Sequence, residues 1–342
     1  MMGRTSMVWF LGVVALSATG CFVSTEVEPQ NEVAVTEQAL GGVAEVVRFG
    51  AGSVLDVGPT YTVFRRRVGS CDTIEVYITT TGERVPSPAL PGCPSITVGT
   101  SQSLILVADR ASGKIYRLNF GFFTSWSVAA SPGTSVIVRQ VLNNDTDLFW
   151  QGDSLIHRVS LSTGVEPQSP KMIAGLARMM AIEGSRLYLN TDNFNSGYDL
   201  VSLYWFKNGV SSTGVIATSP NTFDSYFTYD DSYIYWTHDY GVNNVNTLRR
   251  VGKELGSTVV DYRSSSAIFY RAPVANVSTL WWIEENLLTE VSQIKRKNLV
   301  NGNQSSASFP LKPPGRMRLL SDGLYFPSLT SLTDWSLYRT QR

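Results

Sequence analysis

The sequence predicts an all-β fold built from a repeated four-stranded unit, and three observations support this prediction. A phrase of an apolar residue, a short polar turn and an aromatic pair recurs roughly every 45 residues. The segments between turns are short and rich in Val, Ile, Tyr, Trp and Thr, as strands are. Long stretches with helical periodicity are absent from the sequence. This period and strand content are typical of the blades of a β-propeller.

Two phrases keep the same period and give the number of blades. We assign the first phrase to the second strand of each blade, and it begins at Leu104, Leu148, Leu187, Ile234, Leu280 and Leu324. We assign the second phrase, which usually ends in a basic residue, to the next strand, and its copies are Val63-Phe64-Arg65, Ile115-Tyr116-Arg117, Ile156-His157-Arg158, Leu203-Tyr204-Trp205, Leu248-Arg249-Arg250, Ile294-Lys295-Arg296 and Leu337-Tyr338-Arg339. We therefore expect seven four-stranded blades, with six blades as the alternative.

One blade illustrates the expected strand order. Its inner strand is assigned to Ser135–Gln140, its second strand to Asp147–Gln151, its third to Leu155–Leu161 and its outer strand to the region Lys171–Gly175. The segment Met172–Ile182 has the best helical spacing in the chain. Pro170 and Gly175 argue against a helix there, so we expect an outer strand, a turn and an inner strand.

The last repeat ends three residues after Arg339 and lacks its outer strand. A strand from the N-terminal side would complete the blade and remove an open sheet edge. Val43–Phe49 and Glu32–Thr36 are the two options for this closing strand.

The repeated aromatic residues are expected to fill the space between neighbouring blades. Each buried ring contributes on the order of 2 kcal/mol. The predicted core rings are Tyr188, Tyr235, Trp236, Trp281, Trp282 and Tyr325.

The first twenty residues resemble a bacterial lipoprotein signal peptide. Arg4 precedes an apolar run that is too short to span a bilayer, and Ala18-Thr19-Gly20-Cys21 is similar to a lipobox, with Ala18 where that pattern usually has Leu. The resemblance implies a signal peptide over residues 1–20 and a lipid on Cys21 that anchors the protein to a membrane of the bacterial envelope. The polar residues 21–40 are expected to form a tether, and residues 41–342 a single propeller domain.

The cysteine count fits an exported protein. If Cys21 carries the lipid, Cys71 and Cys93 remain as an even pair in an oxidising compartment, and we expect a disulfide between them. Two separate buried thiols are the alternative.

The blade phrases also resemble a known propeller family. Asp231-Ser-Tyr-Ile-Tyr-Trp-Thr and Ile115-Tyr-Arg-Leu are similar to the blade motifs of the YWTN propellers of low-density-lipoprotein-receptor ectodomains and to bacterial propeller lipoproteins. The receptor class has six blades, whereas seven copies are found here. The resemblance implies a binding or scaffolding role and specifies no activity.

Composition and motifs exclude several function classes. Lys plus Arg and Asp plus Glu are both 28, so the chain has no excess of positive charge that would attract nucleic acid. Catalytic elbows, phosphate loops and calcium-loop motifs are absent from the sequence, and the two histidines lack the partners of a zinc site. We expect His157 to be a structural or surface histidine, and neither a cofactor nor a bound metal is predicted.

Candidate ligand contacts come from unequal connections. The connections between the second and third strands are longest after Leu187, Ile234 and Leu280, so they should lie on consecutive blades at one end of the ring. Their polar and aromatic residues suit a glycan or a peptide. The candidates are Asn190, Asp192, Asn195, Tyr198, His238, Asp239, Tyr240, Glu284, Glu285 and Asn286. Solvated loops, or a calcium ion held by the acids, are the alternatives.

The resulting hypothesis is a non-catalytic, monomeric envelope lipoprotein whose propeller binds or scaffolds a protein or glycan. The alternative hypothesis is a polysaccharide hydrolase or lyase. Such an enzyme would use Asp239 with Glu284 or Glu285 as its paired carboxylates.

Overall fold

A computed structural model describes residues 38–39, 42–69, 71–91, 96–100, 104–120, 124–138, 140–152, 155–166, 169–172, 176–193, 198–207, 210–220, 227–238, 245–286, 288–309, 317–331 and 333–340. All of these residues belong to one compact unit, Thr36–Arg342. The predicted signal peptide, Cys21 and the option Glu32–Thr36 for the closing strand lie outside the described residues. No helix in the described part of the chain has the length and apolar character that crossing a membrane requires.

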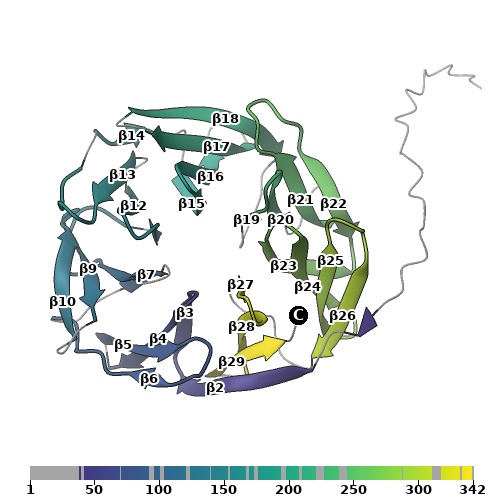
Figure 1. Ribbon diagram of the computed structural model, residues 1–342, viewed down its shortest axis with the longest axis horizontal. Coiled ribbons are helices and arrows are strands. Elements are labelled where there is room, and N and C mark those ends of the chain that lie inside the picture. The colour runs from purple at the N-terminus through teal and green to yellow at the C-terminus, as the bar shows by residue number, and fades with distance from the viewer. Residues whose placement is uncertain are drawn as a thin grey trace, which may run out of the picture. The chain divides into compact units, whose positions relative to one another are not determined.

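Strands in the described ranges form seven sheets, each antiparallel between chain neighbours (Figure 1). The first contains β3 (Ser53–Val57), β4 (Tyr61–Val68), β5 (Cys71–Ile78) and β6 (Arg84–Val85). The second contains β7 (Ile96–Thr100), β8 (Ile105–Asp109), β9 (Lys114–Asn119) and β10 (Ser125–Ala130). The third contains β11 (Val141–Asn143), β12 (Asp147–Gly152), β13 (Leu155–Ser160) and β14 (Lys171–Met172).

The remaining four sheets follow the same order. The fourth contains β15 (Leu176–Glu183), β16 (Arg186–Asn193), β17 (Tyr198–Lys207) and β18 (Val210–Pro220). The fifth contains β19 (Phe227–Tyr229), β20 (Tyr233–His238), β21 (Asn246–Gly252) and β22 (Val260–Ser265). The sixth contains β23 (Ile268–Ala275), β24 (Thr279–Asn286), β25 (Ser292–Asn298) and β26 (Gln304–Phe309), with β1 (Gln38–Ala39) added parallel to β26. The seventh contains β27 (Arg318–Leu319), β28 (Leu324–Leu329), β29 (Asp334–Thr340) and β2 (Val43–Ala51).

The sheets follow one another around a closed ring (Figure 1). The first strand of each sheet contacts the first strand of the next, from β3 through β7, β11, β15, β19 and β23 to β27. The ring closes because β28 and β29 contact β3. The predicted all-β propeller is confirmed.

The closing strand is the first of the two predicted options. β2 pairs antiparallel with β29, with Val43 opposite Thr340 and Arg48 opposite Ser336. Phe49 of β2 is buried and stacks on Phe64 of the neighbouring sheet, with ring centroids 4.8 Å apart. The strand therefore completes both the seventh sheet and its interface with the first.

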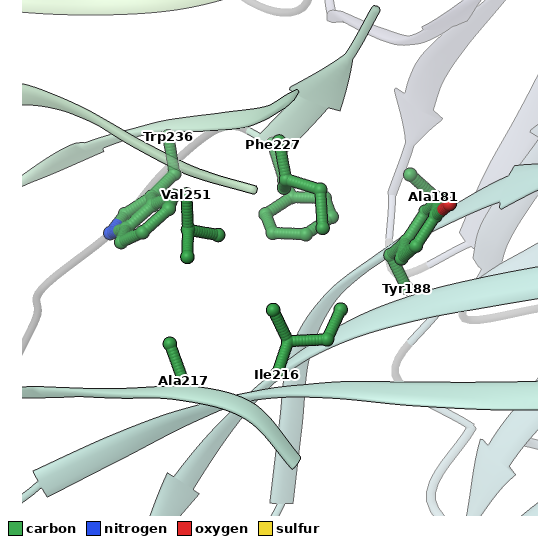
Figure 2. Packing of buried hydrophobic residues seen from close by; sticks show 8 residues of the cluster. Ala181, Tyr188, Ile216, Ala217, Phe227, Trp236 and Val251 are labelled. Carbon is green, nitrogen blue, oxygen red and sulfur yellow. The ribbon is translucent and has the colours of Figure 1, made fainter. Parts of the chain in front are cut away.

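Within the described ranges, seven clusters of buried apolar residues fill the interfaces between neighbouring sheets. Successive side chains of a strand point to opposite faces, so each aromatic pair serves two interfaces. Trp236 belongs to the same cluster as Tyr188 of the preceding sheet (Figure 2), whereas Tyr235 belongs to the same cluster as Trp282 of the following sheet. The six predicted core rings are at most 1% exposed, which confirms their structural role.

Two strand assignments were wrong. The inner strand predicted at Ser135–Gln140 lies at Val141–Asn143 instead, where all three residues are buried. The phrase Val63-Phe64-Arg65 was assigned to a third strand, but it lies in β4, the second strand of its sheet. Both middle strands of a blade are covered on two faces, so their residue patterns are alike. The predicted outer and inner strands within Met172–Ile182 are confirmed as β14 and β15.

Candidate functional site

The described candidate residues lie in strands rather than in loops, so their assignment to connections was wrong. Asn190 and Asp192 belong to the last half of β16, Tyr198 begins β17, His238 ends β20, and Glu284 to Asn286 end β24. These long hairpins continue their pairing beyond the aromatic core: Asn193, for example, still pairs with Tyr198. Asn195, Asp239 and Tyr240 lie outside the described residues.

The hairpins are nevertheless close to one another at one end of the ring. β16, β20 and β24 are the second strands of three consecutive sheets and run in the same sense, so their last residues reach the same end. Tyr188 and Trp236 share one interface cluster. Asn190 and His238 each lie two residues further along these strands, so they face the same interface beyond the apolar cluster.

His238 is enclosed at this interface, with 2% of its surface exposed. An Arg249 guanidinium nitrogen lies 3.1 Å from its Nδ1, and Arg249 also donates to Asp261 at 2.7 Å. Burial, and then repulsion by Arg249, lowers the pKa of His238 to about 4, so the ring is neutral at physiological pH. A neutral imidazole can accept a hydrogen bond at one nitrogen and donate from the other.

Three polar atoms around the His238 ring and its strand neighbours have no hydrogen-bond partner among the described residues. They are Nε2 of His238, Nε1 of Trp236 and Oγ1 of Thr247. Trp236 pairs with Arg249 and His238 with Thr247, which puts all four side chains on one face of the sheet. Such buried groups normally bind protein, water or a ligand. The indole nitrogen of Trp236 points away from the apolar cluster in Figure 2.

His238 and Asn190 were predicted from the sequence as ligand contacts, whereas Arg249, Thr247 and Asp261 were not. Arg249 occurs in the repeated phrase Leu248-Arg249-Arg250, which served only to locate a strand. Arg249 lies near His238 because of the register between β20 and β21, which places Arg249 opposite Trp236. The sequence alone does not show which residues of two strands pair, so it does not reveal this contact.

Glu284 and Glu285 are held in separate environments. Glu284 accepts a hydrogen bond from Trp282 Nε1 at 2.9 Å and lies 3.8 Å from Lys295. Glu285 lies 4.0 Å from Arg271. Adjacent residues of one strand point to opposite faces, so these two carboxylates do not face each other. The expected pairing of Asp239 with either of them stays a prediction, because Asp239 lies outside the described residues.

Asn286 organises the following turn. Its Oδ1 accepts hydrogen bonds from the backbone N–H groups of Leu288 and Thr289, at 2.9 and 3.1 Å. This arrangement is an Asx turn, so the Asn286 side chain is used within its own hairpin.

Outside this end, His157 has structural contacts. Its Nδ1 lies 2.8 Å from Glu166, and its ring stacks on Trp150 at 4.6 Å between centroids. Across the described residues, no group of three or more His, Cys, Asp or Glu side chains is arranged to hold a metal ion.

The closed ring of four-stranded sheets defines a β-propeller, and solved structures show the same architecture. No family model and no curated protein matches the chain. The WD40 domain of Toxoplasma gondii coronin is similar, with 9% identity, a TM-score of 0.58, and coverage of 90% of this chain and 88% of that one. The N-terminal domain of Nup159 has 10% identity, a TM-score of 0.54, and coverage of 90% and 98%.

An enzyme is among the similar structures. A catalytically inactive virginiamycin B lyase from Staphylococcus aureus, solved with quinupristin, has 12% identity, a TM-score of 0.53, and coverage of 87% of this chain and 99% of that one. Sequence identities this low support a shared fold only, so the function has to be argued from the site.

Proposed function

We propose that the protein is a non-catalytic scaffold that binds a protein or glycan partner at the end of the ring where β16, β20 and β24 terminate. The observation that carries this proposal is that the β16–β17 and β24–β25 hairpins flank His238 on consecutive sheets, and that a buried ring nitrogen of His238 has no partner among the described residues. A rigid ring that presents polar groups on neighbouring hairpins suits recognition of an extended polar partner.

The known structures are compatible with a binding role. The similar protein Nup159 occurs in a Saccharomyces cerevisiae complex with Dbp5, Gle1, IP6 and ADP. Glu284 lies 3.8 Å from Lys295 and Glu285 lies 4.0 Å from Arg271. The hydrolase or lyase alternative pairs one of them with Asp239, which lies outside the described residues.

The proposal includes an envelope location with a lipid on Cys21 and a disulfide between Cys71 and Cys93. The lipobox-like sequence supports the anchor. The disulfide-bonded state of Cys71, at the start of β5, supports the bridge; Cys93 lies outside the described residues. Labelling of the expressed protein with a radioactive fatty acid, in the native sequence and in Cys21→Ser, tests the anchor.

Crosslinking in cells, followed by capture of the full chain, tests the binding end. Alanine substitution of Asn195, Asp239 and Glu285 together is expected to reduce recovery of the crosslinked partner. Glu254→Ala, an exposed residue in the turn after β21 at the opposite end of the strands, is the matched control. Equal recovery from the triple variant would remove this end from the proposal.

A further inference from the structure

A second charged site lies between the β19–β22 and β23–β26 sheets, towards the end opposite His238. Its centre is Tyr262 of β22, which is half-buried. The guanidinium carbon of Arg250 lies 5.1 Å from the centre of the Tyr262 ring and 4.5 Å from that of Tyr233. Arg263 lies 5.4 Å and Lys297 5.1 Å from the Tyr262 ring centre. Three cations from three strands thus surround one aromatic ring.

These cations have no carboxylate partner among the described residues. Asp230 accepts hydrogen bonds from the Tyr235 hydroxyl and from two backbone N–H groups. Asp261 is engaged by Arg249, and Glu284 by Trp282 and Lys295. These three carboxylates are therefore used by other groups.

Two buried donors at the cluster also lack partners in the described part of the chain. They are Nε of Arg250 and the hydroxyl of Tyr262. Tyr235 and Trp282 meet the Tyr262 ring edge-on, with centroids 6.1 and 6.5 Å away, which fixes the position of the ring. Fixed donors and unneutralised cations in a partly buried place favour an anion with several acceptor oxygens.

We propose that Arg250, Tyr262, Arg263 and Lys297 form a binding site for a phosphate or sulfate group. Arg side chains match the geometry of such a group through paired N–H donors, and Lys297 adds a point charge from the neighbouring sheet. The site joins two blades, so its occupant would also hold them together. It is separate from the proposed partner-binding end, and either can exist without the other.

Isothermal titration with inorganic phosphate and with sulfate tests the proposal, with chloride at matched ionic strength as the reference. The full chain should bind one equivalent and gain thermal stability. Arg263→Gln combined with Lys297→Gln should weaken binding about tenfold or more. Arg110→Gln combined with Lys114→Gln removes the same charge from the exposed β8–β9 turn and should leave binding unchanged.

Urea unfolding without phosphate checks that each variant folds. If the double variant does not fold, Lys297→Gln alone takes its place, because this residue is only half-buried. Absence of phosphate- or sulfate-dependent binding, or equal binding by the site and control variants, would overturn the proposal.

The same variants identify the source of the group. Phosphatidylglycerol vesicles, with phosphatidylcholine vesicles as reference, probe a lipid headgroup, and dextran sulfate probes a soluble polymer. Preferential loss of one of these interactions in the Arg263 and Lys297 variant supports the site and assigns its source. Retention of both interactions counts against it.

Discussion

Lys253 Nζ lies 2.7 Å from Glu183 Oε1, and the two residues are 70 positions apart in the sequence. The pair joins the β15–β18 and β19–β22 sheets at the end of their interface opposite His238. Tyr188 also donates to Glu183, and the rings of Tyr188 and Tyr229 lie 5.7 and 5.0 Å from the ammonium group. This ion pair and the apolar cluster beside it hold the same two blades together.

Lys253→Met should lower the free energy of unfolding by about 2 kcal/mol, because Lys253 is buried whereas a third of the Glu183 side chain remains exposed. Urea unfolding measures this loss. In a double-mutant cycle with Glu183→Gln, the combined loss should be smaller than the sum of the single losses. Strict additivity would show that the two side chains do not interact.

Tyr235→Phe should destabilise the protein by about 1 to 2 kcal/mol, because it removes a buried hydrogen bond to a carboxylate. The Tyr235 hydroxyl donates to Asp230 at 2.7 Å, and burial followed by this bond raises the pKa of Tyr235. Tyr325→Phe is the matched comparison, because its partner Asp322 has a side chain that is 40% exposed. Tyr325→Phe should lose less free energy of unfolding than Tyr235→Phe. A larger loss in Tyr325→Phe would contradict the view that burial strengthens the Tyr235 hydrogen bond.

Stability should decrease as pH falls through the window set by His238. The pKa of this group is lowered from 6.5 to about 4 by burial and then by Arg249. In the unfolded chain His238 takes up a proton as the pH falls below about 6.5, whereas in the folded chain it does so only near pH 4. The loss across this window should reach about 3 kcal/mol.

His238→Gln keeps a polar side chain without this titration. Carboxylate titrations affect the native protein and this variant alike, so they cancel in the difference between the two free energies of unfolding. This difference should therefore shrink as pH falls. A difference that does not change with pH would contradict the assignment of a neutral, buried His238.

Phe49→Ala should cost about 3 kcal/mol and increase aggregation, because it weakens the closing strand and opens a sheet edge. Phe49 is 4% exposed and contacts both Phe64 and Tyr77. Val68→Ala changes an apolar residue that is 60% exposed in β4 and should be nearly neutral. Thermal unfolding with light scattering distinguishes the two outcomes.

The sequence period predicted most of the fold because each repeat buries the same rings. Tyr188, Tyr235 and Tyr325 occupy equivalent second-strand positions and all face the next sheet, so packing imposes the spacing that the sequence displays. The error at Val63-Phe64-Arg65 has the same physical origin. Second and third strands are both enclosed by neighbouring blades, and the local pattern alone does not distinguish them.

The candidate site was less predictable because its contacts depend on register between strands. His238 was identified from the sequence as a loop residue, yet its burial follows from pairing with Thr247 and from the adjoining sheet. Arg249 becomes its neighbour only when β20 and β21 are aligned. Asn190 and Glu284 were likewise assigned to connections, because turn-like polar residues also occur where a long hairpin continues.

The pairing of Val43 with Thr340 has a consequence for the order of folding. Contacts between residues so distant in the chain form slowly, because closing the long loop between them costs conformational entropy before the contact stabilises the folded state. In six sheets the four consecutive strands can assemble from neighbouring segments, but the seventh sheet obtains its fourth strand, β2, only from the start of the domain. We therefore expect ring closure to be the late, rate-limiting step of folding, and an unclosed ring with β29 exposed to be the species most prone to misassociation.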